Sequence, residues 1–217
     1  MENELKYIYF GDNFKDILKD LLSVFKENGF DILKFQFKEQ EDFYYDTLNF
    51  SILQKEESLR IRKKENGFKG TYKRIVDNSS DYLVREEIEC GLLNLDINFF
   101  LGLLNKKGII FDGDFSLVLV VKNDRQDILV QKDNVTLCIS LDNIFYYNQL
   151  SDNIARDKMI EIEVKDGSND KILNEVNEFV YDNFKFLTIN KDSKYIRGMN
   201  KTSNAQNRIR KKFKGNL

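Results

Sequence analysis

Apolar and polar residues alternate along much of this chain, which is the pattern of β-strands with one buried face. In residues 135–142 the odd positions are Val, Leu, Ile and Leu, whereas the even positions are Thr, Cys, Ser and Asp. Residues 160–165 alternate in the same way, with Ile, Ile and Val in one register and Glu, Glu and Lys in the other. We expect roughly eight to ten such strands, each with an apolar face and a polar face.

Turn residues predict that some of these strands form hairpins. Asn66-Gly67 separates two alternating runs and is a strong signal for a tight hairpin turn. A second hairpin is expected to turn near residues 132–134, where Lys-Asp-Asn interrupts two apolar runs. Both connections favour antiparallel pairing.

Helical spacing of apolar residues appears between the groups of strands. Ile17, Leu18, Leu21, Leu22 and Phe25 predict a helix over about 13–27, which Asn28-Gly29 would end. Further helices are expected over 96–105 and 171–183, and another begins at Ser193. Helices between groups of strands indicate an α+β fold with an antiparallel sheet or barrel.

The polar faces of the expected strands carry Glu, Arg and Lys rather than neutral residues. The spacing Glu-x-Glu-x-Lys occurs at residues 2–6 and again at 161–165. A solvated face is the ordinary explanation for one such strand. If the sheet closes into a barrel of about eight strands, with the helices covering its apolar outer face, the charged faces line the interior. Buried charges need partners, which divalent cations and a polyanion such as a phosphate chain would supply together.

Composition excludes several classes of protein. The chain has 217 residues, 41% hydrophobic and 32% charged, with a net charge of −2, which is typical of a globular protein and not of a generally basic nucleic-acid binder. The absence of His excludes Ser-His triads and His-ligated zinc. No apolar run is long enough to cross a membrane, and the first residues do not resemble a signal peptide. With only Cys90 and Cys138, far apart, we expect a cytoplasmic protein.

An ordered series of seven stretches resembles the CYTH superfamily, the triphosphate tunnel metalloenzymes, and is closest to its inorganic triphosphatase branch. The stretches are ENELKY, the long run FYYDTLNFSILQKEESLRIRKKENGFKGTYK, REEIE, VVKNDR, ISLD, IEIEVKDGS and SKYIRG. The first motif alone is weak, but the series in this order covers nearly the whole chain. We therefore expect a CYTH-like domain over 1–200 and a basic C-terminal tail over 201–217.

The resemblance implies a closed antiparallel eight-stranded β-barrel, with helices packed outside, that binds a triphosphate and Mg²⁺ or Mn²⁺. The expected metal ligands are Glu2, Glu4, Glu87, Glu89, Asp142, Glu161 and Glu163. The expected substrate-binding residues are Lys6, Arg60, Arg62, Lys73, Arg85, Lys122, Arg125 and Lys194. The expected catalytic residues are Glu4, Lys73, Glu161 and Glu163, and Lys165 could be either part of the second signature or structural.

The implied reaction is metal-dependent hydrolysis of inorganic tripolyphosphate to pyrophosphate and phosphate. Thiamine triphosphatase, nucleoside or RNA triphosphatase and class IV adenylate cyclase are alternatives, and a non-catalytic phosphate-binding module is another. Tyr44, Tyr45 and Tyr72 could stack on a base, although packing in the barrel wall is the simpler role. The expected partner is a small triphosphate compound and not a membrane or nucleic acid, with a homodimer left open.

Two features depart from the family pattern. Lys122 and Arg125 are separated by two residues where the family often has one, and a β-bulge between them or a slip at the strand end would reconcile the two spacings. The segment 143–158 is longer than expected, so it is either a lid or a surface excursion.

Overall fold

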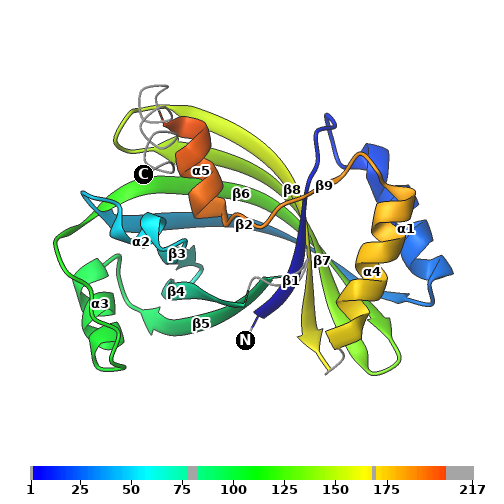
Figure 1. Ribbon diagram of the computed structural model, residues 1–217, viewed down its shortest axis with the longest axis horizontal. Helices are drawn as coiled ribbons and strands as arrows, with labels where there is room; N and C mark the ends of the chain where they lie inside the picture. Colours follow the sequence, from blue (N-terminus) through cyan, green and yellow to red (C-terminus); the bar gives the residue numbers. More distant parts are fainter. Residues whose placement is uncertain (1, 78–82, 168–169, 204–217) are drawn as a thin grey trace, which may run out of the picture.

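The residues described by the computed structural model are 2–77, 83–167 and 170–203, and their strands close into an antiparallel eight-stranded barrel (Figure 1). The order around the barrel is β5-β4-β3-β2-β6-β7-β8-β1, and pairing of β1 with β5 closes it. Its strands are β1 (Glu2–Ile8), β2 (Asp31–Thr47), β3 (Ser58–Lys64), β4 (Gly67–Asp77), β5 (Leu83–Leu92), β6 (Phe115–Lys132), β7 (Val135–Asn148) and β8 (Ile154–Asp166), and β9 (Thr188–Ile189) is added beside β1.

Helices pack around this barrel, as the sequence predicted. They are α1 (Lys15–Glu27), α2 (Ser51–Gln54), α3 (Ile97–Asn105), α4 (Asp170–Asn183) and α5 (Lys194–Thr202). Local sequence explains their ends: Asp96 caps α3 by accepting from the Phe99 N–H at 2.9 Å, and Ser193 caps α5 by accepting from the Ile196 N–H at 3.2 Å. Sequence patterns had not indicated α2 or β9. No described helix is long and apolar enough to cross a membrane.

Both expected hairpins are present. In the second, Lys132 pairs with Val135, so the turn lies where it was predicted. In the first, Lys64 pairs with Gly67, which places the turn at residues 65–66, one position earlier than expected. Gly67 has φ of +104° and Asn66 does not have a positive φ, so the glycine conformation is used at the first residue of β4.

The outer apolar face of the long strands packs on α1 and α4, which lie together at one side of the molecule (Figure 1). Leu137 and Ile139 of β7 and Ile160 and Ile162 of β8 are completely buried in this cluster. Ser140 and Asp142, in the other register of β7, face the interior instead and contact polar residues of β6. The alternation of the sequence is therefore apolar outside and polar inside.

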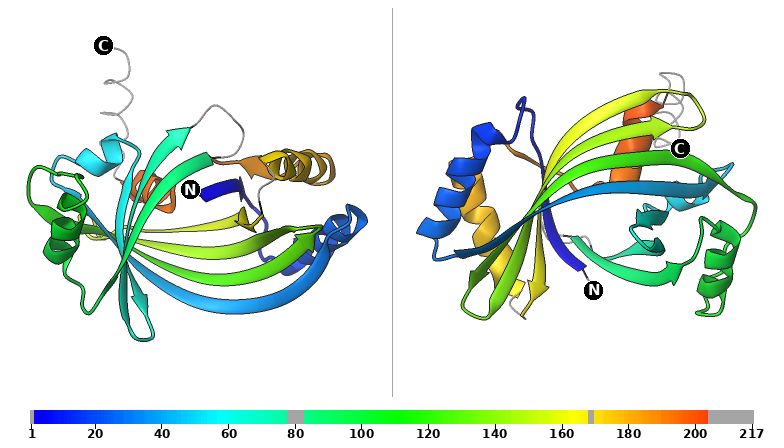
Figure 2. Two further views of the ribbon diagram at one scale, coloured as in Figure 1. Left: turned by 90° about the horizontal axis from the view of Figure 1, so that it is seen from below. Right: turned by 180° about the vertical axis from the view of Figure 1, so that it is seen from behind.

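The inward-facing side chains of the barrel are apolar toward one end and charged further along. Toward one end, β6 and β7 carry apolar Leu119, Ile144 and Tyr146, and α5 packs on them. Gly198 makes this approach close, since a Cβ there would lie 2.5 Å from Tyr146 Cδ1 and 2.6 Å from Leu119 Cδ2. Further along the same strands the inward residues become charged. Figure 2 shows the long strands from below and from behind.

The segment 143–158 is neither a lid nor a surface excursion. The ladder between β7 and β8 continues to Tyr147, which pairs with Ile154, so residues 149–153 alone form the connection. The longer segment lengthens the hairpin and supplies the apolar surface on which α5 rests.

Candidate active site

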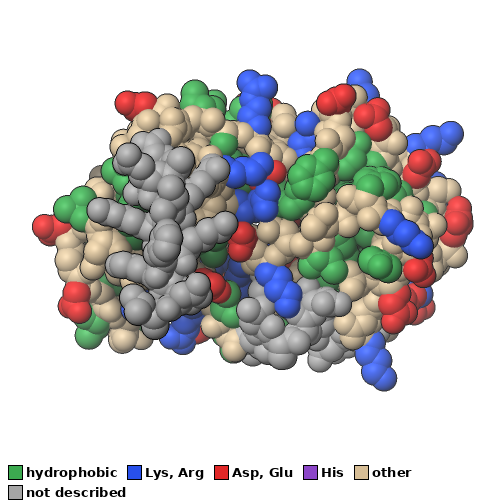
Figure 3. Space-filling view, turned by 45° about the horizontal axis from the view of Figure 1, so that its top comes forward, with side chains coloured by type: hydrophobic (Ala, Val, Ile, Leu, Met, Phe, Trp, Pro, Cys, Tyr) green, Lys and Arg blue, Asp and Glu red, His purple; other side chains and the backbone are tan. Residues whose placement is uncertain are grey.

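A polar cavity of about 280 Å³ lies inside the charged part of the barrel. Figure 3 shows Lys and Arg side chains gathered toward the middle of the face that it displays. The lining brings together nine cationic and five acidic side chains, an excess of four positive charges. Its residues are Glu4, Lys6, Tyr44, Ser58, Arg60, Arg62, Lys69, Lys73, Arg85, Glu87, Glu89, Arg125, Glu161, Glu163, Lys165, Ser193 and Lys194.

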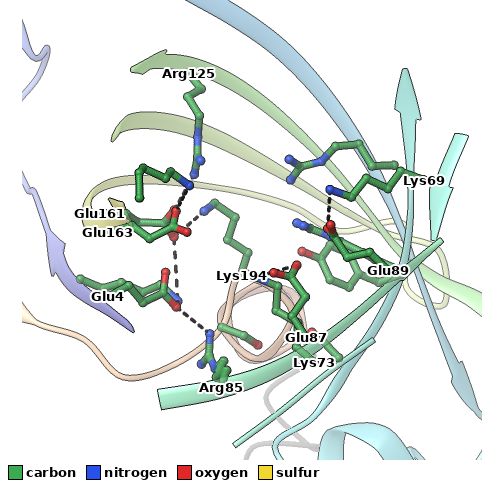
Figure 4. A pocket seen from close by; sticks show the side chains of 17 residues that line it. Glu4, Lys69, Lys73, Arg85, Glu87, Glu89, Arg125, Glu161, Glu163 and Lys194 are labelled. Carbon is green, nitrogen blue, oxygen red and sulfur yellow. Dashed lines mark hydrogen bonds and ion pairs between the residues drawn. The ribbon is translucent and has the colours of Figure 1, made fainter. Parts of the chain in front are cut away.

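The two Glu-x-Glu-x-Lys motifs lie on neighbouring strands. Glu4 of β1 pairs in register with Glu163 of β8, and Lys6 pairs with Glu161. Directly opposite residues of an antiparallel pair have Cβ atoms about 4.5–5.5 Å apart, so Glu4 and Glu163 are cross-strand neighbours. Figure 4 shows Glu4, Glu161 and Glu163 along one wall of the cavity.

Glu4 contacts two cations of the cavity. Its Oε1 accepts from Lys6 Nζ at 2.5 Å and from Arg85 Nη1 at 3.1 Å, and all three side chains are at most 5% exposed. Burial, together with the positive charge of Arg85, lowers the pKa of Lys6 from its usual value. The nearby carboxylates thus do not fully offset burial and the charge of Arg85 at Lys6. An anion that enters the cavity would stabilise the protonated form of Lys6.

Glu161 is the centre of a second group. Its carboxylate accepts from Lys194 Nζ at 2.6 Å and from Arg125 Nη2 at 2.5 Å. Burial alone would raise the pKa of Glu161, but the charges of Lys194 and Arg125 outweigh burial and hold that pKa well below its usual range. Asp142 and Glu161 likewise raise the pKa of Arg125 and Lys194 against the effect of burial, so Arg125, Lys194 and Glu161 remain charged.

Asp142 supports this group from beneath and does not line the cavity. The side chain is completely buried, and it accepts from Arg125 Nε and Nη2 at 2.6 Å each, Asn123 Nδ2 at 2.8 Å and Lys194 Nζ at 2.8 Å. Both carboxylate oxygens are therefore occupied by protein donors. The structure does not bring Asp142 to the position of a metal ligand, although the sequence analysis had included it among the ligands.

Arg60 and Arg62 rest on Asp42 in a similar way. Arg62 donates from Nε and Nη2 to the two Asp42 oxygens at 2.5 and 2.7 Å, and Arg60 Nη1 lies 3.2 Å from Oδ2. Asp42 is only 1% exposed; burial would raise its pKa, but Arg60 and Arg62 outweigh burial and lower that pKa below its usual value. This buried carboxylate fixes where the two guanidinium groups enter the cavity.

The wall facing Glu4 and Glu161 comes from β4 and β5. Lys73 Nζ lies 3.2 Å from Glu87 Oε1, and Lys69 Nζ lies 2.5 Å from Glu89 Oε1 (Figure 4). Burial would raise the pKa of Glu89, but its contact with Lys69 outweighs burial and lowers that pKa. The cavity therefore has carboxylates on two opposing walls, and every one of its five lining carboxylates contacts a Lys or Arg.

Lys122 is placed differently from the prediction. The pairing of β6 with β2 and β7 is continuous from Lys122 to Arg125, so there is no bulge between them and their side chains emerge on opposite faces. Lys122 points outward, with 57% of its side chain exposed, and its Nζ lies 3.4 Å from Glu41 on the surface. Asn123 occupies the inward position next to Arg125 instead.

Two further predictions fall partly outside the described residues. Nothing is described of the Glu2 side chain, although the Glu2 backbone pairs with Arg85. The basic tail was predicted from residue 201, but its residues 204–217 lie outside the described part of the chain. Lys201 belongs to α5, where its Nζ contacts Asp157 at 2.9 Å.

Sequence reasoning missed Asp42, Lys69, Ser58 and Ser193. For the first two a signal was present: Lys69 lies two residues before Thr71, and Asp42 two residues before Tyr44, so strand periodicity points both inward. Ser58 is at the first residue of β3 and Ser193 precedes α5, and no pattern in the sequence indicates that these two positions meet.

The donor set fits the hard divalent cations that the resemblance implies. Among the described residues no three carboxylates converge as a preformed ligand group, since each contacts a nearby Lys or Arg. Mg²⁺ usually needs only one or two carboxylates and completes its shell with water and phosphate oxygens. The cross-strand pair Glu4 and Glu163 can supply two such oxygens, and a cation there would offset the repulsion of two like charges.

Comparisons with known proteins support the fold. Solved structures with the same fold include a proposed adenylate cyclase from Bacillus halodurans (19% identity, 91% of this chain and 96% of that chain, TM-score 0.55). A protein from Pyrococcus horikoshii also matches (24% identity, 93% of this chain and 99% of that chain, TM-score 0.54). A third match is a proposed adenylyl cyclase from Hippeastrum, described as having a dominant triphosphatase activity (16% identity, 94% of this chain and 98% of that chain, TM-score 0.55). No curated protein matches significantly. The family model for the CYTH domain matches residues 1–196, and the chain belongs to this family.

Proposed function

We propose that the protein is a metal-dependent triphosphatase that hydrolyses inorganic tripolyphosphate to pyrophosphate and phosphate. The observation that carries this proposal is the excess of four positive charges in a cavity that also holds five carboxylates. A polyanion would balance the excess of Lys and Arg, whereas simple anion binding gives no reason for so many carboxylates. Family membership supports the same reaction class.

The size and lining of the cavity favour a substrate without an organic group. Its volume of about 280 Å³ lies just below the roughly 300–1,000 Å³ usual for sites of drug-sized ligands. Tyr44 is the single aromatic residue in the described lining, and one face of its ring stacks on Tyr195 at 5.3 Å. Tyr45 and Tyr72 are buried, and Tyr72 packs against Phe111. These contacts favour a packing role for the tyrosines over base stacking.

The chain's own residues would bind and orient the substrate. Arg60, Arg62 and Arg125 present planar guanidinium groups that can hold phosphate oxygens bidentately, while Lys6 and Lys194 act as point charges. Glu4, Glu161 and Glu163 would hold Mg²⁺ or Mn²⁺, which supplies charge neutralisation and an acidified water for attack on phosphorus. Substrate phosphates would replace carboxylates as partners of Lys and Arg, leaving those carboxylates available to the metal.

The substitution Glu161→Gln tests this assignment. Removing one carboxylate charge should raise the Mg²⁺ or Mn²⁺ concentration for half-maximal tripolyphosphate hydrolysis by at least about tenfold, because even residues behind a metal ligand cost 10–100-fold in affinity. Phosphate release during a metal titration is the measurement. Glu86→Gln, on the outer side of β5 where Glu86 contacts Arg74, is the matched control and should leave the titration unchanged.

The same assay separates the alternatives. Tripolyphosphate, ATP and thiamine triphosphate are offered in parallel, and the preferred substrate should be tripolyphosphate. Faster turnover of ATP or thiamine triphosphate would reject the proposed substrate while keeping a triphosphatase. Tight tripolyphosphate binding without phosphate release at any metal concentration would reject catalysis and leave a binding module.

A further inference from the structure

The Tyr45-Asp46-Thr47 motif does not line the cavity. Neither substrate binding nor metal binding therefore accounts for the carboxylate of Asp46. Asp46 is completely buried on β2. Its Oδ1 accepts from the N–H groups of Thr47 at 2.7 Å and Ile52 at 3.0 Å. Its Oδ2 accepts from the Leu53 N–H at 2.9 Å and from the Tyr195 hydroxyl at 2.7 Å. Asp46 therefore joins β2, α2 and α5.

The contact with α5 matters because Lys194 is the one cation of the described lining that a helix supplies. The other eight lie on barrel strands, whose pairing fixes their positions. The position of Lys194 depends instead on how the first turn of α5 is seated. Figure 4 shows Lys194 reaching from this helix toward the acidic wall.

Tyr195 follows Lys194 and is the residue through which the first turn is held. Its ring is completely buried and lies parallel to the Tyr44 ring, with 5.3 Å between centroids and 7° between planes. Stacking alone allows the ring to slide, whereas the hydroxyl bond to Asp46 fixes one point of it. Burial and the Asp46 carboxylate raise the pKa of Tyr195, so the hydroxyl stays protonated and donates.

We propose that Asp46 is a positioning residue, which holds the first turn of α5 in place through its hydrogen bond to the Tyr195 hydroxyl. In this position the Lys194 ammonium contacts Glu161 and Asp142 and can bind a substrate phosphate. The last step of this proposal rests on the proposed function of the cavity. The same carboxylate also caps α2, because it accepts hydrogen bonds from the Ile52 and Leu53 N–H groups.

A double-mutant cycle tests the coupling. Tyr195→Phe keeps the stacked ring and removes only the hydroxyl, and it should lower kcat/KM for tripolyphosphate by about tenfold. In a Lys194→Ala background the same change should alter kcat/KM by less than about twofold, since the residue being positioned is gone. Equal losses in both backgrounds would overturn the proposal. The lowering of Tm should be similar in both backgrounds, which separates positioning from stability.

Tyr146→Phe is the matched control. Tyr146 also packs on α5, but its buried hydroxyl has no hydrogen-bond partner among the described residues. Removing that hydroxyl should leave kcat/KM unchanged. A loss equal to that of Tyr195→Phe would overturn the proposal, because any polar change beneath α5 would then suffice.

A crystal structure of the Tyr195→Phe protein decides the geometry whether or not the native protein hydrolyses tripolyphosphate. Lys194 Nζ should move away from Glu161 Oε1, which lies 2.6 Å from it in the native protein. An unchanged distance would overturn the positioning role. If the native protein binds tripolyphosphate without hydrolysing it, the proposed function fails, and the same cycle is measured on the Kd of tripolyphosphate by calorimetry.

Discussion

At the scale of single residues, the direction in which a side chain leaves its strand decides whether it can take part in the site. Lys122 and Arg125 both belong to the stretch VVKNDR, and both are cations, yet they differ in direction. Arg125 reaches Asp142 and Glu161, whereas Lys122 contacts Glu41 on the outer surface. Both residues are basic, but the pairing of β6 is continuous between them, so their side chains lie on opposite faces of the strand.

This difference predicts unequal effects of two similar substitutions. Arg125→Ala should raise KM for tripolyphosphate by about 10–100-fold, because a bond between charged groups contributes roughly 1.5–3 kcal/mol. Lys122→Ala should change KM by less than about twofold. Steady-state kinetics of both variants is the measurement. Comparable increases in KM would mean that β6 does not have the register described above.

At the scale of elements, the site depends on helix α5 approaching the barrel closely. Gly198 allows this approach because any Cβ at that position would meet the Tyr146 ring and Leu119. Ser193, at the other end of the same helix, begins the turn that carries Lys194. The close packing at Gly198 and the position of the Lys194 side chain thus both depend on one short helix and its Ser193 cap.

The substitution Gly198→Ala should therefore destabilise the protein. Overpacking a tight contact costs about 1–3 kcal/mol of unfolding free energy, which outweighs the better helix propensity of Ala. Gly102→Ala in α3 is the matched control, because a Cβ there meets nothing within 4 Å. That change should stabilise the protein by up to about 1 kcal/mol. Urea unfolding measures both, and a stabilised Gly198→Ala protein would contradict the close packing of α5.

At the scale of the whole molecule, the barrel encloses charge that folding must pair. Asp42 beneath two arginines and Glu161 between Lys194 and Arg125 are buried acids whose pKa values are held low by those cations. Asp42 joins the neighbouring strands β2 and β3. Glu161 joins β8 to α5 through Lys194 and to the non-adjacent strand β6 through Arg125. The charged lumen is therefore part of what holds the barrel together at neutral pH.

A pH dependence of stability follows. Because folding lowers these two pKa values, the unfolded chain takes up protons first on acidification. Their stabilising contribution is complete above the unfolded values of 3.8 for Asp42 and 4.5 for Glu161, and it is lost as pH falls below them. Urea unfolding between pH 7 and pH 3 should show this loss. Asp42→Asn should reduce stability at pH 7 and flatten the decline, whereas an equal decline would exclude Asp42 as its source.

Much of the site could be read from the sequence because strand periodicity is local. Glu4, Lys6, Arg60, Arg62, Lys73, Arg85, Arg125 and Glu161 were all expected on a common interior, and the structure brings them to one cavity. Periodicity could not show which end of each strand reaches the cavity. Asp142 shares the inward register but lies behind Arg125, since its depth depends on side chains from β6 and α5.

The sequence by itself determined which face of each strand is charged, where the hairpins turn to within one residue, and that apolar helix faces could cover the strands. These features depend on neighbours a few residues apart. Only the tertiary structure decided that the two Glu-x-Glu-x-Lys motifs pair strand to strand, that Lys122 stays outside, and that Asp46 reaches α5. Those relations join segments up to 159 residues apart, as between Glu4 and Glu163. No local pattern encodes the distance or angle at which packed elements meet.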